Sequence, residues 1–254
     1  RLGGFSGDLV LPVKKAAHPF GYRNKMAVPA AQASGGAKIG YYRQGTHQVV
    51  PISGCLIQEE ENNRLLRFAA GFLTRHNIYG YNEKSRKGTV RHIMGRVGDH
   101  GEVMAVIVTA SKNLPQEELW VKEIRELLPE VVSVYHNVQD RPGNVILGKT
   151  MRLLWGKPAL TATLCGLTFE ESPYSFFQIN QEQAEVLYNT ALEYAELHGG
   201  ETVIDAYCGT GTISLCLAKK AKKVIGIEIV APAIEDAKKN AERNGLDNVE
   251  FHAA

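Results

Sequence analysis

The clearest pattern of apolar positions lies between residues 201 and 228. Thr202–Ile204 is a β-branched run too short for a helix, and it predicts a strand. Apolar residues at helical spacing over Ile213–Ala221 predict a helix, and Val224–Ile227 predicts a second buried strand that ends at the acid Glu228. A strand, a glycine turn, a helix and a second strand in this order are typical of the start of a Rossmann-like α/β domain.

The turn between these elements carries residue types suited to a nucleoside. Gly209 and Gly211 let the backbone approach a ligand, because a Cβ at either position would fill the space the ligand needs. Glu228, at the carboxyl end of the second strand, can accept both hydroxyls of a ribose. Ser214 stands where a dinucleotide fingerprint has its third glycine, and Asp205 gives the pattern D-x-x-x-G-x-G. That pattern resembles the first motif of S-adenosylmethionine-dependent methyltransferases, although an ordinary Rossmann turn without a ligand also fits it.

The first 173 residues predict strands and two helices without α/β alternation. One helix extends to His76 with Asn62 or Asn63 as its cap, and the other runs from Pro115 to Leu128. Short strand-like runs lie within Lys25–Ala31 and Ile39–Ile52, with turns at Ala33–Gly36 and Gln44–Thr46. The further predicted strands are Thr89–Val97, Glu102–Ala110, Val131–Val138, Val145–Leu147, Met151–Trp155 and Thr161–Phe169. This segment, residues 1–173, is predicted to be an α+β central domain.

Residues 174–254 are predicted to begin a second domain. Asn180 can cap a helix with Gln183 three residues later, as in a capping box. The chain opens on Arg1 and closes in or just after a third strand that starts near Val249. The expected fold class is therefore an α+β central domain followed by a truncated α/β Rossmann-like methyltransferase domain.

Composition narrows the class of protein. Hydrophobic residues make up 44% of the 254 residues and charged residues 22%, enough to bury real cores. The formal net charge is only +2, so a nucleic-acid site must be a local patch. The chain has no apolar run of membrane-spanning length and no secretory leader pattern, which favours a cytoplasmic protein. Its four cysteines are scattered, and their spacing argues against a metal or disulfide framework.

Three separated motifs point to a family. They are Gly21–Lys25 (GYRNK), Ser175–Asn180 (SFFQIN) and Asp205–Gly211 (DAYCGTG). Together they resemble the RNA (uracil-5-)-methyltransferase family, and within it the bacterial enzymes for 23S ribosomal RNA most closely. The resemblance covers nearly the whole chain. It implies methylation of carbon five of a uridine with S-adenosylmethionine, as part of ribosomal RNA processing.

The resemblance also implies site residues. The family's cofactor contacts fall on Gln178, Tyr207 and Glu228, which join Asp205, Gly209 and Gly211 of the turn. Its chemistry needs a cysteine thiolate that adds to carbon six and a carboxylate that later removes a proton from carbon five. In the family both lie after the fourth strand, beyond residue 254, so we expect no catalytic residue here and an inactive chain. Cys208 is expected to be a packing residue.

Basic residues and tyrosines are interleaved in the first hundred residues. Phosphate groups bind to cationic side chains, and unpaired bases stack on aromatic rings. This composition therefore favours an RNA-facing surface. We expect Arg23, Lys25 and Arg91 to contact RNA.

Two other functions stay open on the sequence. A nucleotide-dependent oxidoreductase could use the same turn, although Ser214 disfavours it. An RNA-binding module with a vestigial cofactor fold would carry the same basic surface without chemistry.

Overall fold

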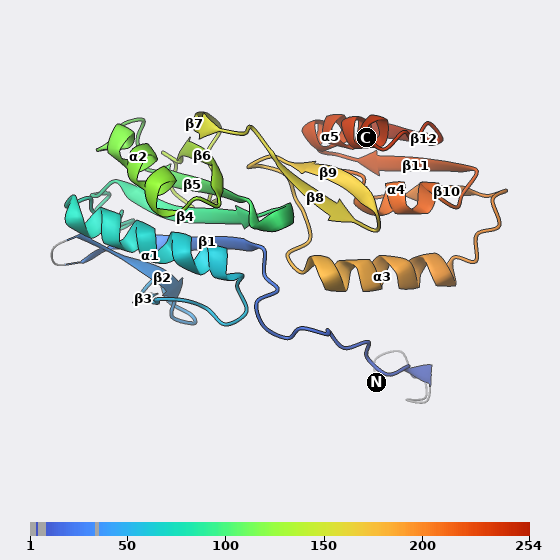
Figure 1. Cartoon of the computed structure of the whole chain (residues 1–254), viewed down its shortest axis with the longest axis horizontal. Coiled ribbons are helices and arrows are strands. Elements are labelled where there is room, and N and C mark those ends of the chain that lie inside the picture. Colours follow the sequence, from blue (N-terminus) through green and yellow to red (C-terminus); the bar gives the residue numbers. More distant parts are fainter. Residues whose placement is uncertain (1–3, 5–8, 34–35) are drawn as a thin grey trace.

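The computed structural model describes residues 4, 9–33 and 36–254. It is a mixed α/β fold with a large mixed sheet. Figure 1 shows this sheet and the helices beside it at one end of the molecule, and a smaller sheet with further helices at the other.

The large sheet has the strand order β3-β2-β1-β4-β5-β6-β7. Its strands are β1 (Lys25–Ala33), β2 (Gly36–Tyr42), β3 (Val49–Pro51), β4 (Val90–Val97), β5 (Val103–Thr109), β6 (Val131–Val138) and β7 (Thr150–Gly156). Only β5 and β6 pair in parallel, and the other neighbours are antiparallel.

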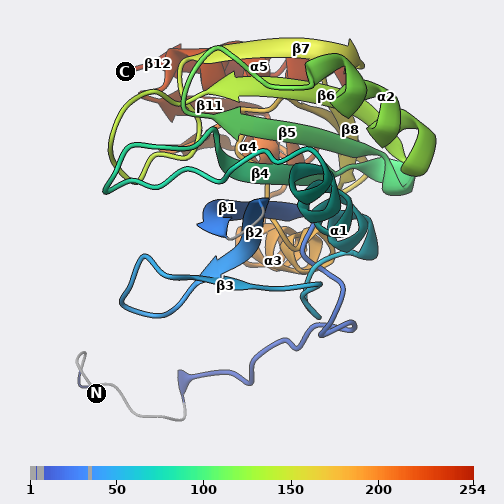
Figure 2. The ribbon, with the colours of Figure 1, turned by 90° about the vertical axis from the view of Figure 1, so that its left-hand side faces the viewer.

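Helices α1 (Glu60–Arg75) and α2 (Glu117–Leu127) cover one face of this sheet. Figure 2 shows both helices on the same side of the strands. Trp120 of α2 is fully buried, and its ring lies 5.1 Å from each of the rings of Phe68 and Phe72 on α1. Burying three large aromatic rings where the helices meet gives this half its main core.

A second core belongs to the other end of the chain. The hairpin β8 (Leu160–Leu164) and β9 (Leu167–Glu171) packs there with α3 (Gln181–Tyr194), α4 (Thr212–Ala218), α5 (Ala231–Arg243) and a parallel three-stranded sheet. That sheet contains β10 (Thr202–Asp205), β11 (Lys223–Glu228) and β12 (Val249–Ala253), with β11 in the middle.

Some predicted elements are wrong in their details. Neither Asn62 nor Asn63 caps α1: Asn62 donates to the Asn24 carbonyl, and Asn63 accepts the Cys55 N–H. The helix predicted from Pro115 starts later, at Glu117, because Gln116 has a left-handed backbone with φ 57°.

The strand predicted over Thr161–Phe169 is two strands. Cys165 and Gly166 have φ of 52° and 70°, so they form a two-residue hairpin turn that returns the chain. Val145–Leu147 is a loop rather than a strand. Helix α5, which carries Pro232 in its first turn, had no counterpart in the sequence prediction.

Asn24 links the large sheet and α1 to the segment that precedes α3. It is 5% exposed, and its N–H and side-chain Nδ2 donate to the carbonyls of Ile179 and Gln178, at 3.0 and 3.1 Å. Its own carbonyl accepts from Asn62 Nδ2 and from the Val97 N–H. All of these polar groups are paired, so the segment before α3 is fixed against β1 and α1.

Candidate functional site

The site predicted at the glycine turn is assembled from two parallel strands. β10 ends at Asp205 and β11 ends at Glu228, so both acids lie at the same edge of the sheet. The Glu228 carboxylate accepts the Gly209 N–H at 3.3 Å and the Val230 N–H at 3.0 Å. It is therefore held at the glycine turn with lone pairs to spare for a ligand.

Ser214 has a role that the sequence did not reveal. Its hydroxyl donates to Asp205 Oδ2 at 2.6 Å, and its side chain is fully buried. Asp205 Oδ1 accepts the Tyr207 N–H at 3.4 Å. Ser214 thus fixes the carboxylate that shapes the turn. In the sequence, this contact could have been suspected only from the serine that stands nine positions after the acid.

The two glycines of the turn are required for different reasons. Gly211 has φ 82°, and a Cβ there would lie 2.9 Å from Phe251 Cζ and 3.2 Å from Ala237 Cβ. Gly209 has φ 54°, and apart from its chain neighbours no atom of the residues described lies within 4 Å of the position of its Cβ. Gly211 is needed by the fold, whereas Gly209 leaves open space at the turn, as a ligand cradle requires.

The side chains of Tyr207 and Cys208 differ sharply in exposure to solvent. Tyr207 is 91% exposed, so it is not packed in the core and its ring is free to meet a ligand. Cys208 is 4% exposed, and its Sγ lies beside Gly226. Burial, together with Asp205 and Glu228, raises the pKa of the Cys208 thiol to about 11. Its environment is that of a packing residue rather than of a thiolate nucleophile.

Gln178 belongs to the segment that precedes α3, and its contact with the cofactor stays a prediction. It lines a cavity of about 700 Å³ between α3 and the segment around Lys14, together with Leu187 and Tyr194. The glycine turn does not line this cavity. The structure therefore brings Asp205, Tyr207, Gly209, Gly211 and Glu228 together, and places Gln178 at the start of α3.

The three cations predicted to contact RNA do not form one patch. Arg91 is turned inward: its side chain is 2% exposed, it donates to the carbonyls of Gln139 and Arg141, and it pairs with Glu83 at 3.1 Å. Arg91 is therefore a structural residue, and the prediction that it contacts RNA directly needs correction.

Arg23 and Lys25 lie near the carboxyl end of β4, where Lys25 of β1 stands opposite Arg96 in the strand register. Both side chains are half-buried, and Arg23 Nε donates to the Lys25 carbonyl at 3.0 Å. Burial and the nearby Arg96 lower the pKa of Lys25 to about 8. Contact of these two residues with RNA stays a prediction.

Glu59, at the start of α1, yields a pH-dependent prediction. Burial, Glu61 and Glu171 raise its pKa from 4.5 to about 7. A raised folded-state pKa means that ionisation destabilises the fold as the pH rises from about 4.5 to 7. Glu59→Gln is expected to gain about 1 kcal/mol of stability at pH 8 and little at pH 4.5, after a discount for partial exposure. Urea unfolding at both pH values measures this.

Glu60→Gln is the matched control. Hydrogen bonds from Arg67 and Asn63 lower the pKa of Glu60, so removing its charge should give no gain at pH 8. Equal effects of the two substitutions would contradict the assignment to Glu59.

Among residues 4, 9–33 and 36–254, no helix is long and apolar enough to cross a membrane. The same described residues contain no group of three or more His, Cys, Asp or Glu side chains that could hold a metal ion.

Comparison with known proteins finds similar sequences over nearly the whole chain. Residues 197–254 match the model of a methyltransferase domain. A Bacillus cereus protein named "Uncharacterized RNA methyltransferase" is 47% identical over 252 residues, covering 99% of this chain and 55% of the relative. A Clostridium tetani protein of the same name is 44% identical over 252 residues, with the same coverage.

A solved structure is also similar. The tRNA (uracil-54, C5)-methyltransferase of Pyrococcus abyssi, in complex with S-adenosyl-L-homocysteine, has a TM-score of 0.78 and 29% identity. The match covers 94% of this chain and 56% of that one. The chain thus spans about half the length of the curated relatives it matches. It is a relative, along nearly all of its length, of proteins named RNA methyltransferases, and its last part matches a methyltransferase domain.

Proposed function

We propose that the chain is part of an enzyme that transfers a methyl group from S-adenosylmethionine to RNA. The observation that carries the proposal is the Glu228 carboxylate, held at the open side of Gly209 beside the exposed Tyr207. A ribose offers two hydroxyl donors to such a carboxylate, and Gly209 leaves room for the nucleoside. The methyltransferase-domain match and the S-adenosyl-L-homocysteine complex of the Pyrococcus relative support this cofactor.

We infer that the methyl acceptor is carbon five of a uridine. The name of the solved relative supports this base, and so do the three motifs that resemble the uracil-5 family. We keep 23S ribosomal RNA as the proposed substrate, because the motifs resemble the ribosomal RNA enzymes most closely. The solved relative is named for transfer RNA, so an assay should present both RNAs.

We also propose a division of labour along the chain, in which residues 1–173 present RNA and residues 174–254 hold the cofactor. The two cores support such a division, although the β8–β9 hairpin packs with the second core. The change of core therefore falls closer to Leu160 than to residue 173.

Glu228→Ala tests the cofactor site. A hydrogen bond to a charged group contributes about 1.5–3 kcal/mol, so S-adenosylmethionine should bind roughly ten- to a hundredfold more weakly. Calorimetric titration of the chain measures this. Glu235→Ala, which removes an exposed acid from α5, is the control and should leave binding unchanged. An unaltered dissociation constant in a folded Glu228→Ala variant would remove Glu228 from the site. If the unsubstituted chain binds NAD in place of S-adenosylmethionine, an oxidoreductase is favoured instead. If it binds neither, an RNA-binding module with a vestigial cofactor fold is favoured.

We further propose that this chain alone does not methylate RNA. Burial raises the pKa of the thiols of Cys165, Cys208 and Cys216, which disfavours the thiolate that attack on uracil needs. Cys55 lies ahead of α1, beside Asn63, and not at the glycine turn. No methyl transfer from labelled S-adenosylmethionine to 23S or transfer RNA transcripts is expected, even where the cofactor binds. Turnover that Cys208→Ala abolishes would show that Cys208 is the nucleophile.

A further inference from the structure

A cavity of about 330 Å³ lies on the face of the large sheet opposite α1 and α2. Pro29 of β1 and His92 of β4 are paired residues that line it, and Tyr42, His47, Glu83 and Asn144 add further walls. A neighbouring cavity of about 700 Å³ shares Tyr42, His47 and Glu83 with it. Figure 2 shows the loops that follow β2 and β6 on the same, left-hand side, beyond the ends of the strands.

Aromatic rings are available for stacking in these cavities. The rings of Tyr42 and His47 meet edge to face, with centroids 5.6 Å apart. Tyr42 remains 42% exposed although it lines both cavities. Tyr81 lines the larger cavity, and its ring is covered by the guanidinium of Arg91 at 4.8 Å. Unpaired nucleobases bind to protein mainly by stacking on such rings.

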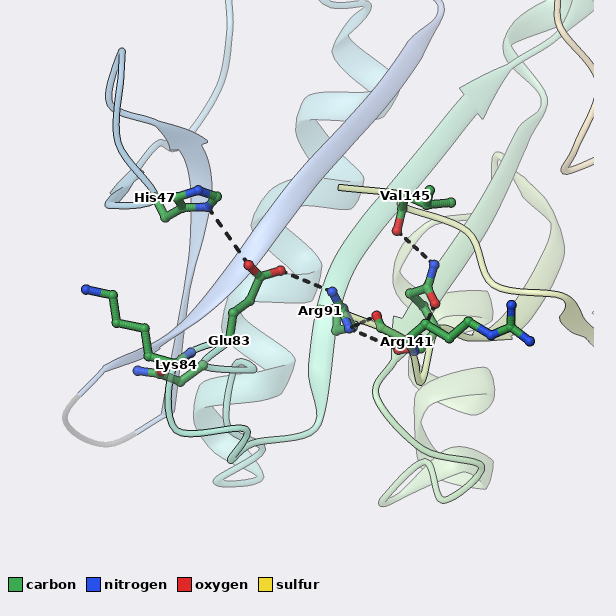
Figure 3. A network of polar contacts seen from close by, with 8 residues as sticks. His47, Glu83, Lys84, Arg91, Arg141 and Val145 are labelled. Atoms are coloured by element: carbon green, nitrogen blue, oxygen red, sulfur yellow. Dashed lines mark hydrogen bonds and ion pairs between the residues drawn. The ribbon is translucent and has the colours of Figure 1, made fainter. Parts of the chain in front are cut away.

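Figure 3 shows that the polar wall is held in place. The Glu83 carboxylate pairs with Arg91 at 3.1 Å and lies 3.9 Å from His47 Nδ1. Arg91 is in turn fixed by the carbonyls of Gln139 and Arg141, which begin the loop over the cavity. The carboxylate therefore has a defined position before any ligand arrives, and it can still accept N–H groups from a base.

His92 supplies an unpaired buried group. Its side chain lines the cavity and is 9% exposed, and its Nδ1 has no hydrogen-bond partner within the described part of the chain. Burial and the neighbouring Arg91 lower the pKa of His92 to about 4, so the ring is neutral at pH 7. The neutral ring adds no charge to this wall of the cavity, so a flat, uncharged base can lie against it.

Cations surround the opening. Lys38 and Lys84 line the larger cavity, and Figure 3 shows the Lys84 side chain extending away from the Glu83–Arg91 pair. Arg43 and Arg86, on the adjoining loops, are exposed. A cavity with stacking rings, a fixed carboxylate and a neutral imidazole, bordered by cations, matches a base with its phosphates.

We propose that these joined cavities bind one unpaired nucleotide of the RNA, separate from the uridine that is methylated. The base stacks on Tyr42 with its edge toward His47, faces Glu83 and His92, and leaves its phosphate toward Lys84. The inference rests on the proposed action on RNA and adds a specificity site to it. Residues of the large sheet and its loops line the cavities, whereas the glycine turn lies beside the small sheet (Figure 1). The RNA therefore contacts both halves of the molecule.

Histidine ring signals in NMR spectra of the 254-residue chain test the site directly. Titration with the four nucleoside monophosphates should shift the signals of His47 and His92 with at least one of them. The signal of His198, which lies between α3 and β10, should stay unchanged. The same titration of Tyr42→Ala should lose these shifts. If no monophosphate moves either signal, or if they move equally in Tyr42→Ala, the proposal fails.

Binding of single-stranded RNA separates this proposal from the proposed function. Loss of one stacked base weakens binding by about five- to a hundredfold, so Tyr42→Ala should bind a short ribosomal oligonucleotide that much more weakly. Tyr194→Ala, which truncates a 67% exposed tyrosine on α3, is the matched control and should bind as the parent does. RNA binding that is insensitive to Tyr42→Ala and Glu83→Gln would overturn the nucleotide site alone. A parent that binds S-adenosylmethionine but no RNA would overturn both.

Discussion

Arg96→Ala is expected to lower the free energy of unfolding by about 3–5 kcal/mol. Arg96 is 2% exposed, and its guanidinium pairs with Glu171 at 3.4 Å and donates to the Ser175 carbonyl. Burial raises the pKa of Glu171, which shows how poorly its charge is solvated. Without Arg96 that carboxylate is left buried and uncompensated, so the fold must either tolerate the charge or protonate it. Urea unfolding at pH 7 measures the loss.

Two controls separate this pair from ordinary ion pairs. The double variant Arg96→Met/Glu171→Leu removes both charges, so it should recover most of the lost stability. Arg152→Ala breaks the exposed pair with Glu117 and should cost about 1 kcal/mol or less. Losses that simply add in the double variant would show that the two charges are not coupled.

Gly211→Ala is expected mainly to lower the stability of the fold, and Gly209→Ala mainly to weaken cofactor binding. The Gly211 variant combines a left-handed backbone with contacts of 2.9 and 3.2 Å to Phe251 and Ala237. It should lose about 2–4 kcal/mol of stability. In the Gly209 variant the new Cβ has no atom of the described residues within 4 Å, apart from its chain neighbours, so the variant should lose only about 1–2 kcal/mol from its backbone. Its methyl group instead enters the space proposed for the cofactor.

Unfolding and calorimetry together distinguish the two glycines. Gly209→Ala should remain folded at room temperature and bind S-adenosylmethionine at least about tenfold more weakly. A Gly209→Ala variant with parental cofactor affinity would place the nucleoside elsewhere. A Gly211→Ala variant as stable as the parent would mean that Phe251 moves aside freely.

Features set by neighbouring residues could be predicted from the sequence. The strand, glycine turn, helix and strand from β10 to β11 formed as expected, because their apolar spacing and glycines act over a few residues. The cap of α3 is also confirmed: Asn180 Oδ1 accepts the Gln183 N–H at 3.0 Å. However, the side chain of Gln183 donates to the Lys14 carbonyl instead of closing a capping box. Lys14 is distant in sequence, so local spacing could not reveal it.

Two further errors concern side chains whose partners only the fold brings within reach. Arg91 looked like a surface cation, and only the fold brings Glu83 and the carbonyls of Gln139 and Arg141 around it. The local motif gave no sign of that enclosure. Ser214 likewise looked like a poor glycine substitute until the turn brought its hydroxyl to Asp205.

The bonds from Asn24 have a consequence for the order of folding. The contact between its side chain and the Gln178 carbonyl spans 154 positions of sequence. Contacts of such separation form late, because a long loop must close before they contribute any free energy. During synthesis Asn24 leaves the ribosome long before Gln178 has been made, so its N–H and amide stay bonded to water in the meantime. We therefore expect the SFFQIN segment to dock onto a sheet that has already formed, with β1 as its template.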